Sequence, residues 1–203
     1  MKAETRETIK DKDFELIHSI NNGKSDRFYE LVEQYENKLY NFGMKMCGNV
    51  QDSEDMVQDT FLNVFRYLKD FRYETRFKNW LYRIATNTCI KKKRKSKYAP
   101  DRELSFEEFL PDEVEQRATE LPDWVSIPSD DLLDDELSRV INDAILDLPE
   151  KYRLVLVLRD KEEFSTEEAA QILSLTPANI KVRLHRARLF LRDKLKGYFR
   201  NEP

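Results

Sequence analysis

The stretch from Ser165 to Phe199, STEEAAQILSLTPANIKVRLHRARLFLRDKLKGYF, decides the fold of the C-terminal part of the chain. Ser165 followed three residues later by Glu168 is the pattern of a capping box, which predicts the start of a short helix. Thr176 followed by Pro177 predicts the start of a second helix after a tight corner, because threonine caps helices and proline is tolerated at the first helical position. A short helix, a tight turn and a longer helix form a helix-turn-helix.

The second of these helices combines an apolar face with a basic surface. From Thr176 to Arg200 the chain has eight Lys or Arg and one acid. Such a helix can enter the major groove of DNA. A basic amphipathic helix can also be just a solvated surface, but the caps, the corner and the polar Asn179 occur together and favour DNA binding. The apolar residues at helical spacing predict an inward face made of Ile180, Leu184, Ala187, Leu191 and Leu195.

The composition of the chain excludes several classes of protein. Its 203 residues carry a net charge of −4, are 36% charged and include only four Gly, which is typical of soluble helical proteins. No apolar run approaches the ~20 residues of a membrane span, and the N-terminus lacks the apolar core of a secretory signal. We therefore expect a cytoplasmic protein without membrane insertion. Two Cys and two His without metal-ligand spacing predict reduced thiols, no metal site and no cofactor.

The charge is unevenly distributed and predicts the domain organisation. Lys91–Lys97 holds six basic residues and no acid, whereas Asp101–Glu136 holds fourteen acids and two Arg. Four Pro and the absence of sustained periodicity predict an acidic flexible linker over residues 98–135. The expected fold class is all-α, with two small helical domains on either side of this linker. The predicted parts are an N-terminal segment with a short helix (1–25), a first domain (26–97), the linker and a second domain (136–203).

The first domain is predicted to contain a helix with a surface for a protein partner. Acids in a first helical turn are favoured by the helix dipole alone, but exposed apolar residues are not. The outer stripe of the third predicted helix carries Asp55, Gln58, Asp59 and Leu62, with Phe65 near its edge.

Helices are predicted over 14–22, over 28–46 after a cap at Asp26, over 52–68 with a cap at Asp52, and over 77–95. The residues up to Asp13 are expected to be frayed.

The helix predicted over 77–95 carries Trp80, Arg83, Asn87 and Lys91 along one side. Aromatic rings interleaved with cations suit unstacked nucleotides, because rings stack on bases while cations hold phosphates. The alternative for Trp80 is a place in the core.

In the second domain, the periodicity predicts a helix over 136–148. It predicts another helix that begins at Pro149 and runs through Leu158.

Four motifs, in this order and spacing, resemble bacterial sigma factors: DSEDMVQDTFLNVF, RFKNWLYRIATN, LPEKYRLVLVLRD and TPANIKVRLHRAR. The chain is most similar to the extracytoplasmic-function branch of the sigma-70 family, which has two conserved domains, regions two and four. The resemblance covers about residues 26–97 and 136–199. It implies a transcription initiation factor without an active site, which binds core RNA polymerase through the beta-prime clamp helices and the beta flap and binds promoter DNA. An anti-sigma protein is a further candidate partner.

The resemblance also implies roles for single residues. The minus-35 element would be read by Thr176, Asn179, Lys181, Val182, Arg183, His185 and Arg186. The melted minus-10 element would be held by Phe71, Trp80, Arg83, Asn87 and Lys91. The clamp helices would be bound by Asp55, Gln58, Asp59, Leu62 and Phe65.

Two other classes of function remain as alternatives. One is a stand-alone helix-turn-helix regulator whose N-terminal domain senses a ligand or dimerises. The other is an enzyme, which fits poorly because the sequence has no phosphate-binding glycine loop, metal cluster or nucleophile-base spacing.

Overall fold

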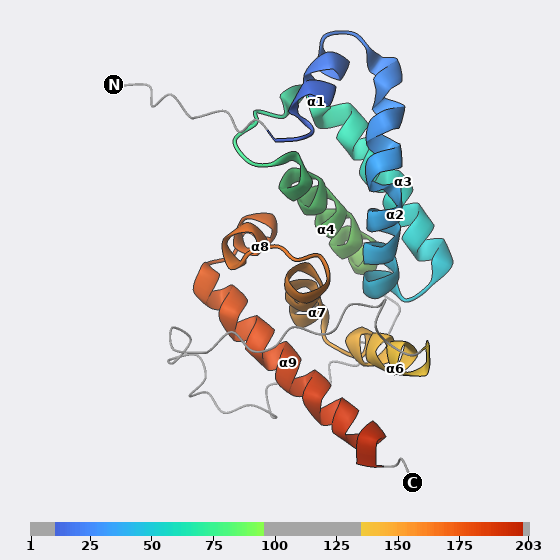
Figure 1. The fold of residues 1–203 in the computed structure, drawn as a ribbon, viewed down its shortest axis with the longest axis vertical. Helices are drawn as coiled ribbons and strands as arrows, with labels where there is room; N and C mark the ends of the chain where they lie inside the picture. Colours follow the sequence, from blue (N-terminus) through green and yellow to red (C-terminus); the bar gives the residue numbers. More distant parts are fainter. Residues whose placement is uncertain (1–10, 96–134, 201–203) are drawn as a thin grey trace. The chain divides into compact units, whose positions relative to one another are not determined.

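The computed structural model describes residues 11–95 and 135–200. Within these two stretches the chain is helical and contains no strand, which confirms the predicted all-α class. The described residues form two units, one built essentially from α1–α4 and the other from α6–α9 (Figure 1). Residues 98–134 of the predicted linker and the N-terminal residues 1–10 lie outside the described residues, and the predicted domain boundaries remain predictions.

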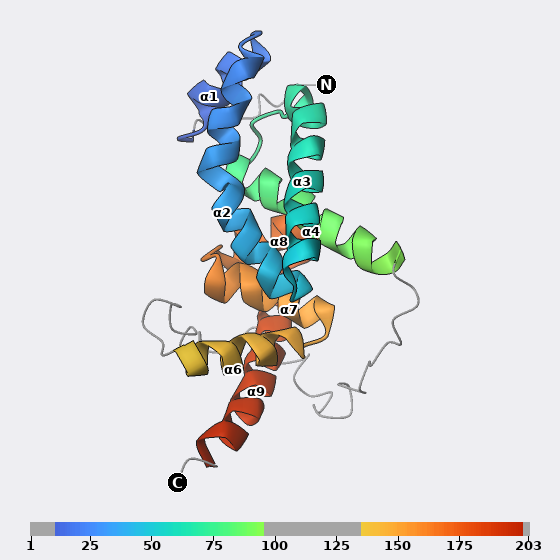
Figure 2. The ribbon, with the colours of Figure 1, turned by 90° about the vertical axis from the view of Figure 1, so that its right-hand side faces the viewer.

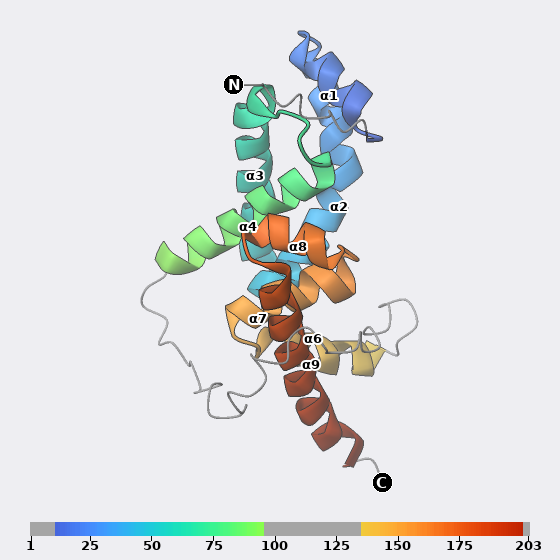
Figure 3. The same cartoon turned by 90° about the vertical axis from the view of Figure 1, so that its left-hand side faces the viewer.

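In the first unit, helices α2 and α3 lie side by side and α4 crosses them (Figures 2 and 3). Aromatic rings join α2 to α4: Tyr35 lies 5.6 Å from Phe77, and Phe42 lies 5.3 Å from Tyr82, measured between ring centroids. All four side chains are fully buried and form the core of the unit. The helices are α1 (Phe14–Asn21), α2 (Phe28–Cys47), α3 (Val50–Tyr67) and α4 (Phe77–Lys95), with 3₁₀ turns at Ser25–Arg27 and Leu68–Asp70.

A glycine permits the close approach of α2 and α3. A Cβ atom added at Gly43 would lie 2.7 Å from the Met56 Cε and 3.2 Å from the Ser53 Cα. The Met56 side chain is flexible and can move away, but the backbone of α3 would have to shift by a few tenths of an ångström. A glycine at position 43 therefore allows the two helices to pack this closely.

Two predicted helix caps of the first unit are wrong. The cap of α3 is Asn49, whose side chain accepts a hydrogen bond of 2.8 Å from the backbone N–H of Asp52. Asp52 thus lies inside the first turn, and α3 begins two residues earlier than predicted. Asp26 lies within a 3₁₀ turn that precedes α2. Aspartate is common both at caps and in first turns, so its presence alone did not locate the helix start.

The second unit is arranged around α9, its longest helix, which packs against α6, α7 and α8 (Figure 1). The predicted capping box is present: the Ser165 Oγ accepts from the Glu168 N–H at 3.0 Å, and the Glu168 Oε2 accepts from the Ser165 N–H at 2.9 Å. The corner is made by Ser174 in the left-handed conformation, with φ 55°. The helices are α6 (Asp135–Leu146), α7 (Glu150–Leu156), a π-helical turn (Val157–Lys161), α8 (Thr166–Leu173) and α9 (Pro177–Arg200).

Candidate nucleic-acid interface

The start of α9 presents a polar surface. The predicted cap is confirmed, because the Thr176 Oγ1 accepts a hydrogen bond of 3.2 Å from the Asn179 N–H. The side chains of Asn179 and Lys181 are exposed, whereas Arg183 and His185 are half-buried. Residues four apart share a face of a helix, so Asn179 lies beside Arg183 and Lys181 lies beside His185. Lys, Arg and Asn at such a surface can donate hydrogen bonds to phosphates and to base edges.

Val182, predicted to take part in reading the minus-35 element, is buried with 7% of its surface exposed, and its role stays a prediction. The apolar spacing from Ile180 to Leu184 predicted a narrow inward stripe. The structure encloses α9 between three helices, so the buried arc is wider and includes Val182.

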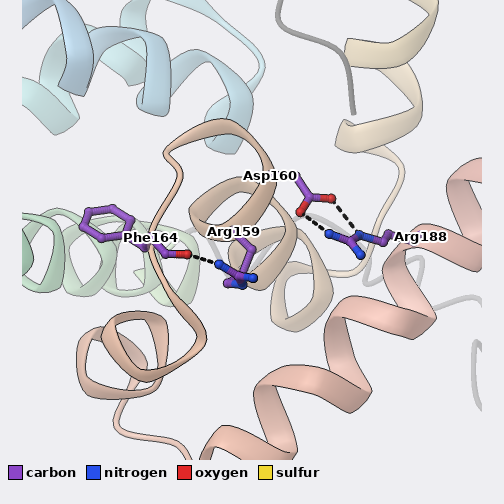
Figure 4. A network of polar contacts seen from close by, with 4 residues as sticks. All are labelled: Arg159, Asp160, Phe164 and Arg188. Carbon is purple, nitrogen blue, oxygen red and sulfur yellow. Dashed lines mark hydrogen bonds and ion pairs between the residues drawn. The ribbon is translucent and has the colours of Figure 1, made fainter. Parts of the chain in front are cut away.

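Two arginines of α9 turn inward instead of pointing to solvent. The guanidinium group of Arg188 forms two hydrogen bonds with the carboxylate of Asp160, from Nε to Oδ2 at 2.9 Å and from Nη2 to Oδ1 at 2.7 Å (Figure 4). The side chain of Asp160 is almost fully buried. Arg186 reaches the hydroxyl group of Tyr152 on α7, at 3.5 Å. Both arginine side chains are half-buried.

The π-helical turn after α7 brings Asp160 into this position. Next to it, Arg159 donates a hydrogen bond to the backbone carbonyl of Phe164, which closes the loop before α8 (Figure 4). Arg159 and Asp160 are consecutive and point to different partners, one to the loop and one to α9. Consecutive side chains of any helix point in different directions, which is why these two neighbours reach different partners.

The imidazole of His185 lies close to the same cluster of cations. Burial lowers the pKa of His185, and the positive charges of Arg192, Arg188 and Arg186 lower it further. The neutral imidazole is thereby favoured at neutral pH, and a neutral imidazole can both donate and accept a hydrogen bond.

A second polar face runs along α4. Arg83, Asn87 and Lys91 are exposed and follow one another at intervals of four residues, so they lie in one row. Trp80 continues the row at one end and is half-buried, with its ring 5.1 Å from that of Phe71 and 5.8 Å from that of Phe77. The structure therefore brings together four of the five residues predicted for the minus-10 element.

The fifth residue, Phe71, adjoins this row through the contact of its ring with Trp80, but only 7% of it is exposed. Its role at the minus-10 element stays a prediction. The loop turns Arg72 to solvent beside it. Sequence reasoning missed Arg72; the alternation of Phe71, Arg72 and Tyr73 was the available signal, because a loop packed on a core alternates buried and exposed side chains.

The outer side of α3 forms a third surface. Gln58 and Asp59 are exposed and Asp55 is half-buried. Leu62 and Phe65 are 47% and 55% exposed, and the Phe65 ring contacts the Phe28 ring at 5.1 Å. The prediction that large apolar side chains accompany the acids on an exposed surface is confirmed. Exposed large apolar groups that cluster mark binding surfaces for proteins.

Other kinds of site find no support in the part of the chain that the structure describes. No group of three or more His, Cys, Asp or Glu side chains gathers there in a way that could hold a metal ion. Among the helices of residues 11–95 and 135–200, none combines the length and the apolar character that a membrane crossing requires.

Comparison with known proteins identifies the family. Residues 31–98 match the model of Sigma-70 region 2, and residues 138–191 match that of Sigma-70, region 4. The chain is 36% identical over 180 residues to the ECF RNA polymerase sigma factor SigW of Bacillus subtilis, covering 89% of this chain and 95% of the relative. It is 31% identical over 183 residues to the ECF RNA polymerase sigma-E factor of Haemophilus influenzae, covering 89% and 94%.

Solved structures share the fold. CnrH, in a complex with the cytosolic domain of CnrY, superposes with a TM-score of 0.65 at 24% identity, covering 92% of this chain and 99% of CnrH. The sigma factor RpoE of Bartonella quintana, in a complex with the anti-sigma factor NepR, gives a TM-score of 0.62 at 24% identity, covering 83% and 96%.

The chain belongs to the extracytoplasmic-function sigma factors of the sigma-70 family. It directs promoter-specific initiation of transcription by RNA polymerase. The three surfaces described above are the candidates for the parts of the molecule that carry out this function.

Proposed function

We propose that the two units divide the work of promoter recognition among three surfaces. The start of α9 reads the duplex minus-35 element, the polar face of α4 holds the melted minus-10 strand, and the outer stripe of α3 binds the beta-prime clamp helices of core RNA polymerase. The observation that carries this proposal is the separation of charge within the first unit. The row of Arg83, Asn87 and Lys91 lies on α4, whereas the acids Asp55 and Asp59 lie on α3.

The face of α4 has the chemistry that a single strand requires. Arg83 and Lys91 offer cations to phosphates, and Asn87 between them offers an amide to a base edge. Trp80 is half-buried, so part of one ring stays available for stacking while the rest is held by Phe71 and Phe77. Arg72 is an exposed cation on the loop before α4, next in sequence to the Phe71 ring that contacts Trp80.

The start of α9 has the chemistry that a duplex requires. Asn179, Lys181 and Arg183 carry hydrogen-bond donors in the first two turns of a helix whose residues 176–179 are all exposed. In a helix-turn-helix, the N-terminal residues of the second helix contact base edges. Two contacts hold the helix to the rest of the unit: Arg186 with the Tyr152 hydroxyl group, and Arg188 with the Asp160 carboxylate.

The stripe on α3 suits a basic, partly apolar protein surface. Asp55 and Asp59 repel phosphates, which argues against DNA on this face, whereas Leu62 and Phe65 offer apolar area that a protein partner can cover. We assign this stripe to core polymerase. We further propose that the chain has no catalytic activity, acts in the cytoplasm and is held inactive by an anti-sigma protein. The structurally similar RpoE of Bartonella quintana was solved in a complex with the anti-sigma factor NepR.

The assignment of α3 is tested by charge reversal. Replacing Asp55 and Asp59 by Lys should abolish binding to core polymerase, because like charges across a complementary interface cost several kcal/mol. The matched control replaces Glu33 and Glu36 by Lys, two exposed acids on α2 that change the net charge equally. Binding is measured by a pull-down with core, and function by run-off transcription. Wild-type core affinity of the Asp55/Asp59 variant would refute the assignment.

The run-off assay also decides between this proposal and a stand-alone regulator. Bare core polymerase should start at defined promoters only when this protein is added. A stand-alone regulator would bind duplex DNA but would leave core polymerase without promoter specificity.

A further inference from the structure

The first unit contains a capping contact that spans 66 residues of sequence. The Oδ2 of Asp11 accepts a hydrogen bond of 2.7 Å from the backbone N–H of Phe77, the first residue of α4. The first N–H groups of a helix have no partner within the helix, and a carboxylate at that end also interacts favourably with the helix dipole. Asp11 therefore caps α4, although it precedes residue 31, where the match to region 2 begins.

Asp11 is itself held in place. Its Oδ1 accepts a hydrogen bond of 3.1 Å from the Asp13 N–H. Asp13 is 2% exposed, and its carboxylate accepts hydrogen bonds from the Tyr35 hydroxyl at 2.5 Å and from the Gln34 Nε2 at 2.6 Å. The predicted fraying up to Asp13 is thus wrong for Asp11–Asp13, because the carboxylates of this segment are bound to α2 and α4.

Helix α1 supports the loop that leads into α4. Its Phe14 ring lies 5.0 Å from the Tyr73 ring, which lies 4.9 Å from Phe71, which in turn lies 5.1 Å from Trp80. Asn21, at the other end of α1, donates a hydrogen bond of 3.2 Å to the backbone carbonyl of Leu68. A line of ring contacts thus runs from α1 to the nucleotide-facing side of α4.

The loop needs this support because part of its backbone is strained. Tyr73 has φ 56°, a left-handed conformation that bulky residues adopt only when their surroundings enforce it. The Tyr73 ring contacts two other rings, those of Phe14 and Phe71. Burial also raises the pKa of Tyr73, in keeping with a ring that is withdrawn from solvent.

We propose that Asp11 and Phe14 are positioning residues for capture of the melted promoter strand. Asp11 fixes the first turn of α4, and Phe14 fixes the loop through Tyr73, so that Trp80 and Arg72 face the strand together. This inference rests on the proposed function of the α4 face. It assigns a role in holding the strand to Asp11 and Phe14, which precede the part of the chain that matches region 2.

The test uses the holoenzyme assembled from core polymerase and the full chain. The probe is a labelled single-stranded DNA with the non-template minus-10 sequence of a promoter used in the run-off assay. Asp11→Ala should weaken binding of this DNA about fivefold, the effect expected for the loss of one helix cap. Phe14→Ala should weaken it by a similar factor, because the Tyr73 ring loses one of its two ring contacts. Affinity for core should change less than about twofold, since neither residue lies on the α3 stripe.

Asp11→Asn is the conservative variant, because its amide oxygen can still accept from the Phe77 N–H. It should restore most of the affinity that Asp11→Ala loses. If Asp11→Asn is as weak as Asp11→Ala, or if both variants lose core affinity in proportion, the two residues only stabilise the unit and the inference is wrong.

Arg83→Ala separates this inference from the proposed function. If Arg83→Ala weakens binding of the single strand while Asp11→Ala and Phe14→Ala bind it normally, the positioning role is refuted and the α4 surface stands. If Arg83→Ala also binds normally, the α4 face does not hold the strand and both proposals fail.

Discussion

The two units hold their candidate DNA-facing side chains by different forces. In the first unit, the Trp80 ring packs against the rings of Phe71 and Phe77, and these contacts involve no charged group. In the second unit, α9 is fixed by the bidentate ion pair between Arg188 and Asp160. Ring packing is tolerant of direction, whereas a bidentate pair sets the rotation of a helix about its own axis.

This difference suits the two targets. A single strand is flexible and can adapt to a stacking surface, so the exact angle of Trp80 matters less than its exposure. A duplex presents base edges at fixed positions in the groove, so a recognition helix that is rotated loses its contacts. A buried ion pair contributes little net stability. We therefore interpret the Arg188–Asp160 pair as a device for orientation.

The largest effect is expected from the ring contacts. Phe71→Ala should destabilise the first unit by about 3–5 kcal/mol, because a buried ring is replaced by a cavity. Native-state hydrogen exchange should show faster exchange of the α4 amides and little change in α7–α9. Tyr67→Ala is the matched control, since this ring is more than half exposed. An equal loss of protection in both units would contradict the separation of forces described above.

The next effect concerns the ion pair. Asp160→Ala should destabilise the second unit by about 2–3 kcal/mol, because Arg188 is left partly buried without its carboxylate. Asp147→Ala is a close control: it removes an ion pair of 2.9 Å between Asp147 and Lys194 of α9, but both side chains are about half exposed. Its effect should stay below about 1 kcal/mol and vanish at high salt. Similar effects of the two changes in chemical denaturation would show that Asp160 is no better placed than a surface acid.

Much of the fold follows from local sequence patterns. The capping box at Ser165, the cap at Thr176 and the inward face of α9 involve residues three or four apart, so the sequence suffices to predict them. The same holds for the exposure of Leu62 and Phe65, which follows from the helical period of α3.

Contacts between distant residues were beyond the reach of such patterns. Asp160 and Arg188 are 28 residues apart, and Asp11 and Phe77 are 66 residues apart. Periodicity also does not tell how many neighbours enclose a helix, so it did not predict that Val182 is buried. The resemblance named Phe71 as a residue of the minus-10 site, but only the packing of its ring on Trp80 shows that the side chain turns inward.

A smaller effect is expected at the surface of α9. Lys181→Ala should weaken binding of the holoenzyme to minus-35 duplex by about 1–2 kcal/mol. If Lys181 reads a base, specificity should relax at one position; if it contacts a phosphate, the loss should be equal for all sequences. Lys196→Ala removes the same charge from an exposed position four turns further along α9 and should have little effect. Equal losses for the two variants would mean that only the total charge of α9 matters.

The smallest effect concerns the pH dependence of the second unit and tests whether its cluster of cations is as tight as the geometry indicates. The pKa of His185 is lowered from 6.5 by burial and by Arg192, Arg188 and Arg186. When the pH falls through about 6.5, the unfolded chain takes up a proton at this position before the folded unit does. Stability contributed by the neutral imidazole is therefore present above the unfolded pKa and is lost as the pH falls towards the lower, folded value.

Other groups titrate in the same range, so the informative quantity is the difference between the wild type and His185→Gln, which cannot be protonated. The free energy of unfolding of the second unit should fall more steeply for the wild type than for His185→Gln between about pH 7.5 and pH 5.5. Asp160→Ala should steepen this fall further, because loss of the carboxylate leaves the positive charge of Arg188 uncompensated beside the imidazole. Parallel pH profiles of the wild type and His185→Gln at constant salt would show that burial and the three arginines together do not lower the pKa of His185 in the folded unit.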